Sequence, residues 1–369
     1  MTTTINNEHK KLNVPNLRFK EFQGEWSVTT LQKDCIVNPT NEKIADKFVY
    51  VDLESVKQGQ LYKYQILTKD NAPSRAQRVL HTDDILFQCV RPYQMNNYMV
   101  KGTMSDIQWV ASTGYAQIRT QTDYPAFLYY VLNTSKYNKA VMVRCTGSSY
   151  PAINSEDLSK IPFYKCGIAE QKKIADFLSL LDERIATQNK IIDKLQSLIK
   201  GIADKLFQTA RTTKPLLEFA PNITSGTDKS GSGTIPLYGS TGIIGTVKNA
   251  SQKGNIVLVA RVGTIGTVQY VNEPCGVSDN ALIVEAGEMT KYIYHFLKTY
   301  NFTRITSGTT QPLITASSLK KAAIPTYDIE SQTRIVLCLN GLEKKLDMAK
   351  QYLSDIAVMK RYLLRQMFI

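Results

Sequence analysis

The sequence predicts an α+β protein in which two mixed α/β domains are separated by two long antiparallel coiled-coil helices, forming a pseudo-twofold internal repeat. Three observations predict this fold class. A motif recurs at a fixed offset, an apolar heptad pattern follows each copy, and short strand-like runs precede each copy.

The repeated motif is Gly147–Leu158 (GSSYPAINSEDL), which is similar to Gly308–Leu319 (GTTQPLITASSL) at a constant offset of 161 residues. The offset continues beyond the motif, where Ile168 matches Ile329. Because single cores rarely grow past about 250 residues, a chain of 369 residues with such a repeat should contain more than one core.

The apolar pattern after each copy predicts two long helices that pair with each other. Apolar positions recur in steps of four and three from Ile174 to Leu206 and from Ile335 to Met367, with Gln188 as a polar interruption in the first run. A strict heptad repeat buries a narrow seam against another helix. The residues expected to pair the helices are Ile174, Leu178, Leu181, Ile185, Ile192, Leu195, Ile335, Leu339, Leu342, Leu346, Leu353 and Ile356.

These patterns divide the chain into five segments: an N-terminal segment (1–26), a first domain (27–166), a first spacer helix (167–210), a second domain (211–328) and a second spacer helix (329–369). Asp328 is the expected N-cap of the second helix, and Lys214-Pro215 limits the first. Each helix of about 40 residues would extend roughly 60 Å, a length that suits a spacer.

Both domains should mix strands and helices. Strand-like runs separated by Gly, Pro, Asn and Ser include Lys47–Leu53, Asp84–Val90, Asn255–Ala260 and Ala281–Val284. Helix-like stretches lie near Tyr124–Leu132 and Tyr292–Tyr300. Outside the shared motif the two domain sequences hardly resemble each other.

The composition favours a polyanionic partner in a reducing compartment. Lys and Arg number 45 against 32 Asp and Glu, a net charge of +13, which suits nucleic acid or an anionic membrane surface. The N-terminal residues Met1–Lys11 have no apolar stretch of signal-peptide length, and no apolar run approaches a membrane span. The six cysteines are widely scattered. We expect a cytoplasmic protein that has no membrane partner.

No catalytic or metal-binding constellation is indicated. The three histidines, His9, His81 and His295, have no His or Cys partner at metal-ligand spacing. The sequence has no Gly-Lys dipeptide of a phosphate-binding loop and no Pro-Asp dipeptide of the common nuclease arrangement. Asn38-Pro39 is followed by Thr40, unlike the loop with which adenine methyltransferases hold a flipped base. We expect no catalytic residue, no metal site and no enzymatic activity.

Basic, amide and aromatic residues cluster in both domains, and such residues read base edges or hold phosphates. The candidate DNA-binding residues of the first domain are Arg75, Arg78, Arg91, Tyr93, Gln94, Asn96, Arg144, Ser148, Ser149 and Tyr150. Those of the second domain are Lys229, Tyr238, Lys248, Arg261, Thr264, Arg304, Thr309, Thr310 and Gln311. For any single residue a solvated loop is the simpler explanation, so the prediction depends on the clusters.

The junctions carry a family pattern. The first runs from Ile161-Pro162 through Ala169-Glu170-Gln171-Lys172-Lys173-Ile174-Ala175 to Leu178, Leu181-Asp182 and Ile185. It resembles the start of the conserved helix in type I restriction–modification specificity subunits. The second copy is similar, with Ser331 where that pattern has Glu. Val14–Phe19 through Trp26, and Ile235–Tyr238 with Ala260–Gly266, resemble the first parts of two target-recognition domains.

The resemblance implies a non-catalytic DNA specificity subunit. Each domain would recognise one half of an interrupted, asymmetric target in double-stranded DNA, and the helices would fix the spacing. The implied partners are modification (methyltransferase) subunits, expected to be two, and restriction (endonuclease and translocase) subunits. S-adenosylmethionine, ATP and Mg would be bound by those partners and not by this chain. Two alternatives stay open: a coiled-coil DNA-binding scaffold without sequence specificity, and a self-contained restriction or modification enzyme.

Overall fold

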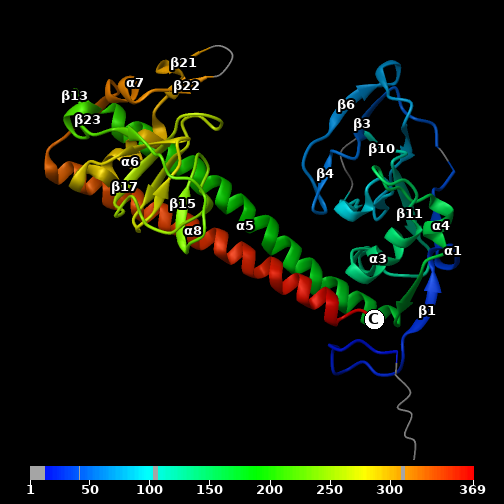
Figure 1. Cartoon of the computed structure of the whole chain (residues 1–369). Coiled ribbons are helices and arrows are strands. Elements are labelled where there is room, and N and C mark those ends of the chain that lie inside the picture. The colour runs from blue at the N-terminus through cyan, green and yellow to red at the C-terminus, as the bar shows by residue number, and fades with distance from the viewer. Residues whose placement is uncertain (1–12, 41, 103–106, 309–311) are drawn as a thin grey trace, which may run out of the picture. The chain divides into compact units, whose positions relative to one another are not determined.

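The computed structural model describes residues 13–40, 42–102, 107–308 and 312–369. The chain divides into two compact units, Met1–Thr187 with Leu353–Ile369, and Gln188–Tyr352. Each unit contains one mixed domain and a stretch of both long helices, α5 (Ile168–Gln208) and α8 (Ile329–Gln366), as Figure 1 shows. The predicted fold class, two mixed domains with long helices, is confirmed.

The first domain contains two four-stranded sheets. One has the order β2-β11-β8-β9, formed by Cys35–Val37, Tyr115–Thr120, Ile85–Gln88 and Tyr98–Met99. The other has the order β6-β3-β10-β7, formed by Gln65–Thr68, Lys47–Val51, Gln108–Ser112 and Ala76–Val79. The β3 and β10 strands are parallel, and all other neighbours are antiparallel.

Alternating side chains of the first sheet serve two different cores. Leu86 and Tyr115 pack with Val49 and Trp109 of the second sheet. The intervening residue Phe87 packs on the opposite face, in a core that includes α2 (Pro125–Leu132) and the beginning of α5. Because successive strand residues point to opposite faces, one strand supports both the sheet-to-sheet contact and the contact with the helices.

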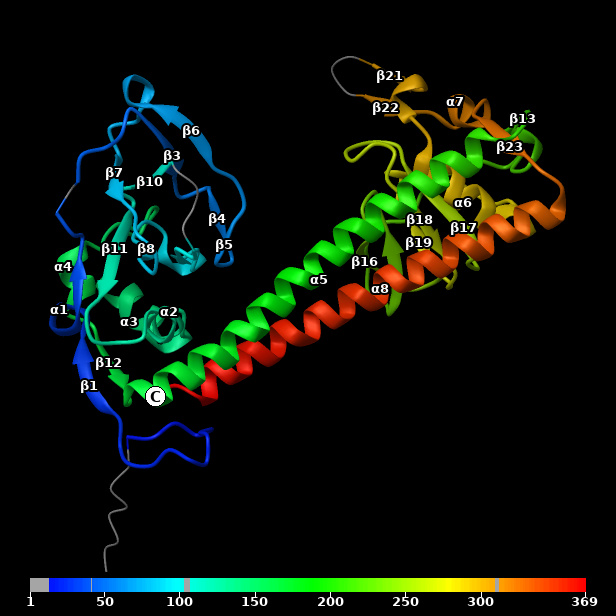
Figure 2. The ribbon, with the colours of Figure 1, turned by 180° about the vertical axis from the view of Figure 1, so that it is seen from behind.

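The second domain repeats this arrangement with fewer strands. Its larger sheet has the order β14-β20-β17-β18, formed by Thr224–Ser225, Ala281–Val284, Ile256–Ala260 and Val268–Val271. Its smaller sheet has the order β16-β15-β19, formed by Ile243–Val247, Ile235–Tyr238 and Gly276–Val277, with β15 and β19 parallel. Figure 2 shows the second domain from behind, with β16, β17, β18 and β19 labelled.

The two domains share a topology, although their sequences hardly resemble each other outside the shared motif. The order β2-β11-β8-β9 matches β14-β20-β17-β18, and each second sheet contains a parallel pair next to an antiparallel one. The alternation of apolar residues along a strand decides which face is buried, and many sequences satisfy the same alternation. The two domains therefore differ in residue identity but have the same topology.

The repeated motif forms the same elements in both domains. Asn154 caps α4 (Ser155–Ser159) by accepting from Asp157 N at 2.7 Å, and Thr315 caps α7 (Ala316–Lys320) by accepting from Ser318 N at 3.1 Å. A strand at each domain's start pairs with one at its end: β1 (Ser27–Thr30) with β12 (Pro162–Lys165), and β13 (Thr212–Pro215) with β23 (Ala323–Thr326).

The remaining helices are α1 (Leu31–Asp34), α3 (Ser135–Arg144) and α6 (Thr290–Thr299). The remaining strands are β4 (Val56–Lys57), β5 (Gln60–Leu61), β21 (Thr306–Ser307) and β22 (Leu313–Ile314). Short 3-10 helices span Lys69–Asn71, Pro92–Gln94, Leu216–Glu218, Gly287–Met289 and Phe302–Arg304.

The long helices pair in each unit. In the first, Leu178 of α5 shares a core with Leu363 and Met367 of α8. In the second, Gln188 Nε2 donates to Ala349 O at 3.0 Å, and Phe207 shares a core with Ile335. All the residues expected on the seam are buried or half-buried.

The helix ends follow local chemistry. Asp328 accepts a hydrogen bond from Ser331 N at 2.7 Å, as an N-cap does. The α5 helix ends at Gln208, before Lys214-Pro215.

The N-terminal segment is bound to both long helices within the first unit. Leu17 N donates to Gln366 O at 2.9 Å, near the end of α8. The Arg18 guanidinium makes a bidentate ion pair with the buried Glu170 at the start of α5, with distances of 2.7 and 2.8 Å. This segment therefore stabilises the junction between the first domain and the helices.

Candidate nucleic-acid interface

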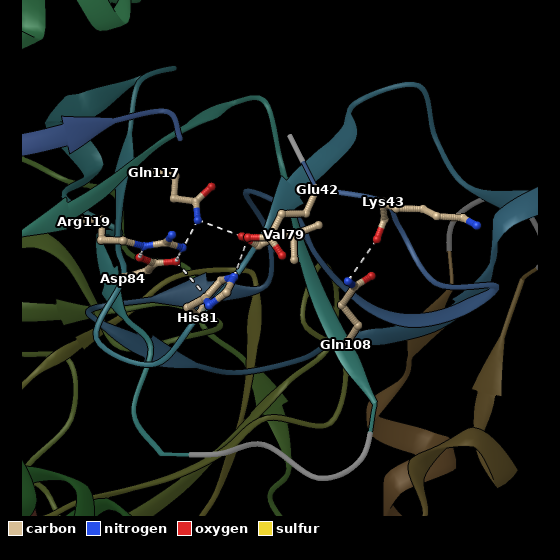
Figure 3. A network of polar contacts seen from close by, with 8 residues as sticks. All are labelled: Glu42, Lys43, Val79, His81, Asp84, Gln108, Gln117 and Arg119. Carbon is tan, nitrogen blue, oxygen red and sulfur yellow. Dashed lines mark hydrogen bonds and ion pairs between the residues drawn. The ribbon is translucent and has the colours of Figure 1, made fainter. Parts of the chain in front are cut away.

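A buried carboxylate, Asp84, and a buried amide, Gln117, form a polar network that reaches both sheets of the first domain (Figure 3). Asp84, just before β8, accepts from Arg119 Nε at 2.8 Å, Arg119 Nη2 at 2.9 Å and Gln117 Nε2 at 2.7 Å. The same Gln117 amide donates to Val79 O of β7 at 2.8 Å. Because these groups satisfy one another, they hold the beginning of β8, the strand β11 and the strand β7 together.

The side chain of Gln88 holds the loop after β8. Gln88 is buried, with 2% of its surface exposed. Gln88 Nε2 donates to Val90 O at 2.8 Å and to Gln94 Oε1 at 2.9 Å. Gln88 Oε1 accepts from Asn96 N at 3.1 Å. One buried side chain thus fixes three points of a loop that contains four of the predicted DNA-binding residues.

The ends of this loop have an unusual backbone. Arg91 and Met95 are both left-handed, with φ of 53° and 52°, on either side of the 3-10 helix Pro92–Gln94. Left-handed residues other than glycine are uncommon and persist where the surroundings fix them. Arg91 N donates to Pro151 O at 2.8 Å, which attaches the loop to the hairpin loop of the repeated motif.

Four predicted residues line one cleft of about 670 Å³ in the first domain: Arg75, Arg91, Gln94 and Asn96. Sequence reasoning missed other residues of its wall, including Lys57, Tyr62 and Lys63. The basic and aromatic run from Lys57 to Tyr64 was a signal that could have indicated them. The cleft also contains the carboxylates of Asp52 and Glu54, so it is polar rather than uniformly basic.

The other predicted residues of the first domain fall into two groups. Tyr93, Arg144, Ser148, Ser149 and Tyr150 are exposed. The Arg91 guanidinium lies over the Tyr150 ring, 4.7 Å from its centroid, so the two loops also meet through side chains. Arg78 is half-buried on β7; burial lowers the pKa of its guanidinium, and its Nε has no hydrogen-bond partner among the residues described.

In the second domain, the loop after β17 contains Arg261 and Thr264 and lies beside the segment that contains Arg304. A Cβ added at Gly266 would lie 2.6 Å from the Phe302 ring, so only glycine allows this close approach. Thr264 and Arg304 are exposed, while Arg261 is half-buried with an unpartnered Nε among the described residues. The predicted Thr309, Thr310 and Gln311 lie outside the described residues.

The three remaining candidates of the second domain are Tyr238 at the end of β15, Lys248 just after β16, and Lys229 in the segment before β15. Lys229 and Lys248 are exposed. The Tyr238 hydroxyl donates to Glu273 Oε1 at 2.7 Å, and burial together with this carboxylate raises the pKa of Tyr238 to about 12. Its phenol is therefore engaged within the domain.

The two loops occupy equivalent places. Ile153 N donates to Cys89 O at 3.0 Å, and its repeat partner Ile314 N donates to Arg261 O at 3.0 Å. Cys89 thus corresponds to Arg261, and Arg91 corresponds to Gly263, which is also left-handed with φ of 72°. The two loops therefore share a backbone arrangement, but the arginine is Arg91 in the first domain and Arg261, two positions earlier in the shared arrangement, in the second.

The histidines and acidic groups do not assemble a metal site within the described parts of the chain. Among the described residues, no helix is both long and apolar enough to cross a membrane. His295 is buried; its Nε2 lies 2.9 Å from Asn340 Oδ1, and burial lowers the pKa of its ring. His81 is exposed beside Glu42, and His9 lies outside the described residues.

Two domains of one topology, with different side chains on equivalent loops and joined by paired helices, define a protein with two recognition domains. The family model described as the type I restriction modification DNA specificity domain matches the chain twice, over residues 35–197 and 213–357. The chain belongs to this family, and the prediction of a type I restriction–modification specificity subunit is confirmed.

Solved structures agree in fold. The S subunit of a type I restriction–modification system from M. genitalium is 19% identical, with a TM-score of 0.65, over 96% of this chain and 99% of that chain. A chain from a structure of the complex assembly and conformational transition of the type I R-M system is 19% identical, with a TM-score of 0.57, over 92% and 96%. No curated protein matches the sequence.

Proposed function

We propose that this chain binds double-stranded DNA at an asymmetric, bipartite target, with each domain recognising one half-site. The observation that carries this proposal is the equivalence of the loops after β8 and β17, which share a frame and differ in side chains. A common frame would approach each half-site in the same way, while Arg91 and Gln94 in one domain and Arg261 and Thr264 in the other would select different bases.

Charge supports DNA as the ligand. The net charge of +13 would neutralise phosphates and release counterions. The exposed Lys229, Lys248 and Arg304 suit phosphate contacts, because they have no ion-pair partner among the described residues. Binding should therefore weaken as salt is raised.

The helices would bind modification subunits, the methyltransferase components. The outer face of a coiled coil is normally polar, yet Leu198 of α5 is 50% exposed and Met359 of α8 is 49% exposed. These residues lie 161 positions apart, so they are repeat equivalents, one in each unit. Exposed apolar side chains of this kind suit a protein interface, and their duplication supports two modification subunits.

The chain itself would be non-catalytic. In this proposal the modification subunits bind S-adenosylmethionine and methylate adenine, and restriction subunits bind ATP and Mg for translocation and cleavage. The complex would act in the cytoplasm, where the DNA is. A scaffold without sequence specificity is less favoured because the equivalent loops have diverged while their frame has not.

The test is co-expression of this chain with a cognate modification subunit in a host free of adenine methylation. Methyladenine would then be mapped across the host genome by single-molecule sequencing, with the modification subunit alone as the control. A bipartite, asymmetric motif that requires this chain would support the proposal. A stable complex that yields no motif would contradict it.

A further inference from the structure

The geometry points to Arg91 as the residue that recognises a guanine in the half-site of the first domain, with Gln88 and Tyr150 as its positioning residues. This inference rests on the proposed DNA-binding function and gives it a specific base. Arginine donates two parallel hydrogen bonds to O6 and N7 of guanine, a pattern that other bases do not accept in the major groove.

The Arg91 guanidinium is free to bind a ligand. Arg18 and Arg119 form bidentate pairs with Glu170 and Asp84. By contrast, the Arg91 side chain has no carboxylate or hydrogen-bond partner within the described parts of the chain. It lines the cleft of about 670 Å³, where its donors can reach a base edge.

Arg91 is held in place before any ligand binds. Its backbone is left-handed, its N donates to Pro151 O at 2.8 Å, and its guanidinium lies 4.7 Å from the Tyr150 ring centroid. Gln88 fixes the rest of the loop through Val90, Gln94 and Asn96. A planar guanidinium stacked on an aromatic ring loses little freedom when it binds a base.

The second domain has no arginine at the position equivalent to Arg91. There the equivalent residue is Gly263, which has no side chain, and the guanidinium comes from Arg261, two residues earlier. The loop of the second domain therefore cannot present an arginine at the position of Arg91. A guanine contact from Arg91 would belong to one half-site only, which suits an asymmetric target.

The experiment uses the complex of the full chain with its modification subunit, and it begins with the wild-type methylation motif. We expect this motif to contain a guanine in one half. Arg91→Ala and Arg91→Gly should relax that single position, and discrimination against the other bases in duplex binding should fall by about 5- to 150-fold. Arg91→Gly keeps the left-handed backbone unstrained, so a normal melting temperature for this variant separates base recognition from folding.

Two further variants test the positioning and the specificity of the effect. Tyr150→Ala should lower binding, while Tyr150→Phe, which keeps the ring, should restore it. Lys136→Ala is the matched control, because Lys136 also lies over a tyrosine ring, 5.5 Å from the Tyr164 centroid, yet does not line the cleft. It should leave the motif unchanged.

The outcomes separate this inference from the proposed function. A wild-type complex without a motif would overturn the proposed function and, with it, this inference. A wild-type motif that persists in Arg91→Gly would overturn the guanine contact alone. Uniformly weaker binding with an unchanged motif would also overturn it, because that result is typical of a phosphate contact.

Discussion

Gln188 and Ala349 occupy the same place in the two repeats, 161 residues apart, and Gln188 Nε2 donates to Ala349 O at 3.0 Å. In an antiparallel pair of repeated helices, equivalent residues can meet only near the midpoint of the pair. This contact therefore fixes the register of α5 against α8 within the second unit. Gln188 is 8% exposed and is the polar interruption of the first heptad run.

The first prediction concerns this residue. Gln188→Leu should raise the melting temperature, because leucine completes the apolar seam. Ala349 O would not be left unsatisfied, since it lies inside α8 and accepts the helical hydrogen bond from Leu353 N. Gln188→Ala, which leaves a gap, is the control and should lower the melting temperature. If Gln188→Leu is less stable than wild type, the hydrogen bond of the Gln188 amide contributes to the stability of the helix pair and not only to its register.

The second prediction concerns the buried ion pair at the start of α5. Arg18→Ala leaves the Glu170 carboxylate buried without its partner and should lower the free energy of unfolding by about 3–5 kcal/mol. Arg18→Lys keeps the charge but loses the bidentate geometry, so its effect should be smaller. Urea unfolding measures both. Equal stability of Arg18→Ala and wild type would mean that the N-terminal segment does not stabilise the junction.

The third prediction concerns pH. Burial by itself raises the pKa of the Asp34 carboxyl. The Lys165 ammonium, whose Nζ lies 2.8 Å from Asp34 Oδ2, and a hydrogen bond from Thr29 lower it by more, so the pKa lies below its ordinary value. A lowered carboxyl pKa stabilises the fold above the unfolded-state value of about 3.9, and this stability is lost as the pH falls through the folded-state value.

Asp34→Asn should therefore be less stable than wild type at neutral pH, and the difference should shrink as the pH falls below about 4. Thermal unfolding across a pH series measures this. A difference that stays constant down to the lowest pH would show that the Asp34 charge does not contribute.

The fourth prediction concerns assembly. Leu198→Glu with Met359→Glu should prevent binding of the modification subunits, because charges would replace exposed apolar side chains, while the melting temperature stays near that of wild type. Size-exclusion chromatography of the mixed subunits measures assembly. The matched control is Ser354→Glu, an exposed α8 position outside this apolar pair. Normal assembly of the double variant would place the interface elsewhere.

The sequence predicted the helices well because their signal is local and periodic. Each seam residue from Ile174 to Ile356 is specified by its own spacing, and the heptad pattern does not depend on distant contacts. The strands Lys47–Val51, Ile85–Gln88, Ile256–Ala260 and Ala281–Val284 were found for the same reason.

Long-range pairing could not be predicted in this way. Nothing near Arg18 indicates that it will pair with Glu170, 152 residues away. The shared sheet order was missed because residue identity at the strands has changed while alternation has not. In the candidate site, residue type indicated Arg91. Its backbone hydrogen bond to Pro151 and its contact with Tyr150 could not be predicted, because both involve a hairpin loop about 60 residues later in the chain.

The central claim, that each domain recognises one half-site, is tested most directly by exchanging a single domain. Residues 27–166 would be replaced by the corresponding domain of a relative with a known target, and methyladenine would be mapped in cells that also contain the modification subunit. If each domain recognises one half-site, one half of the motif becomes that of the relative while the other half and the spacing stay the same. A change in both halves, or in neither, would contradict it.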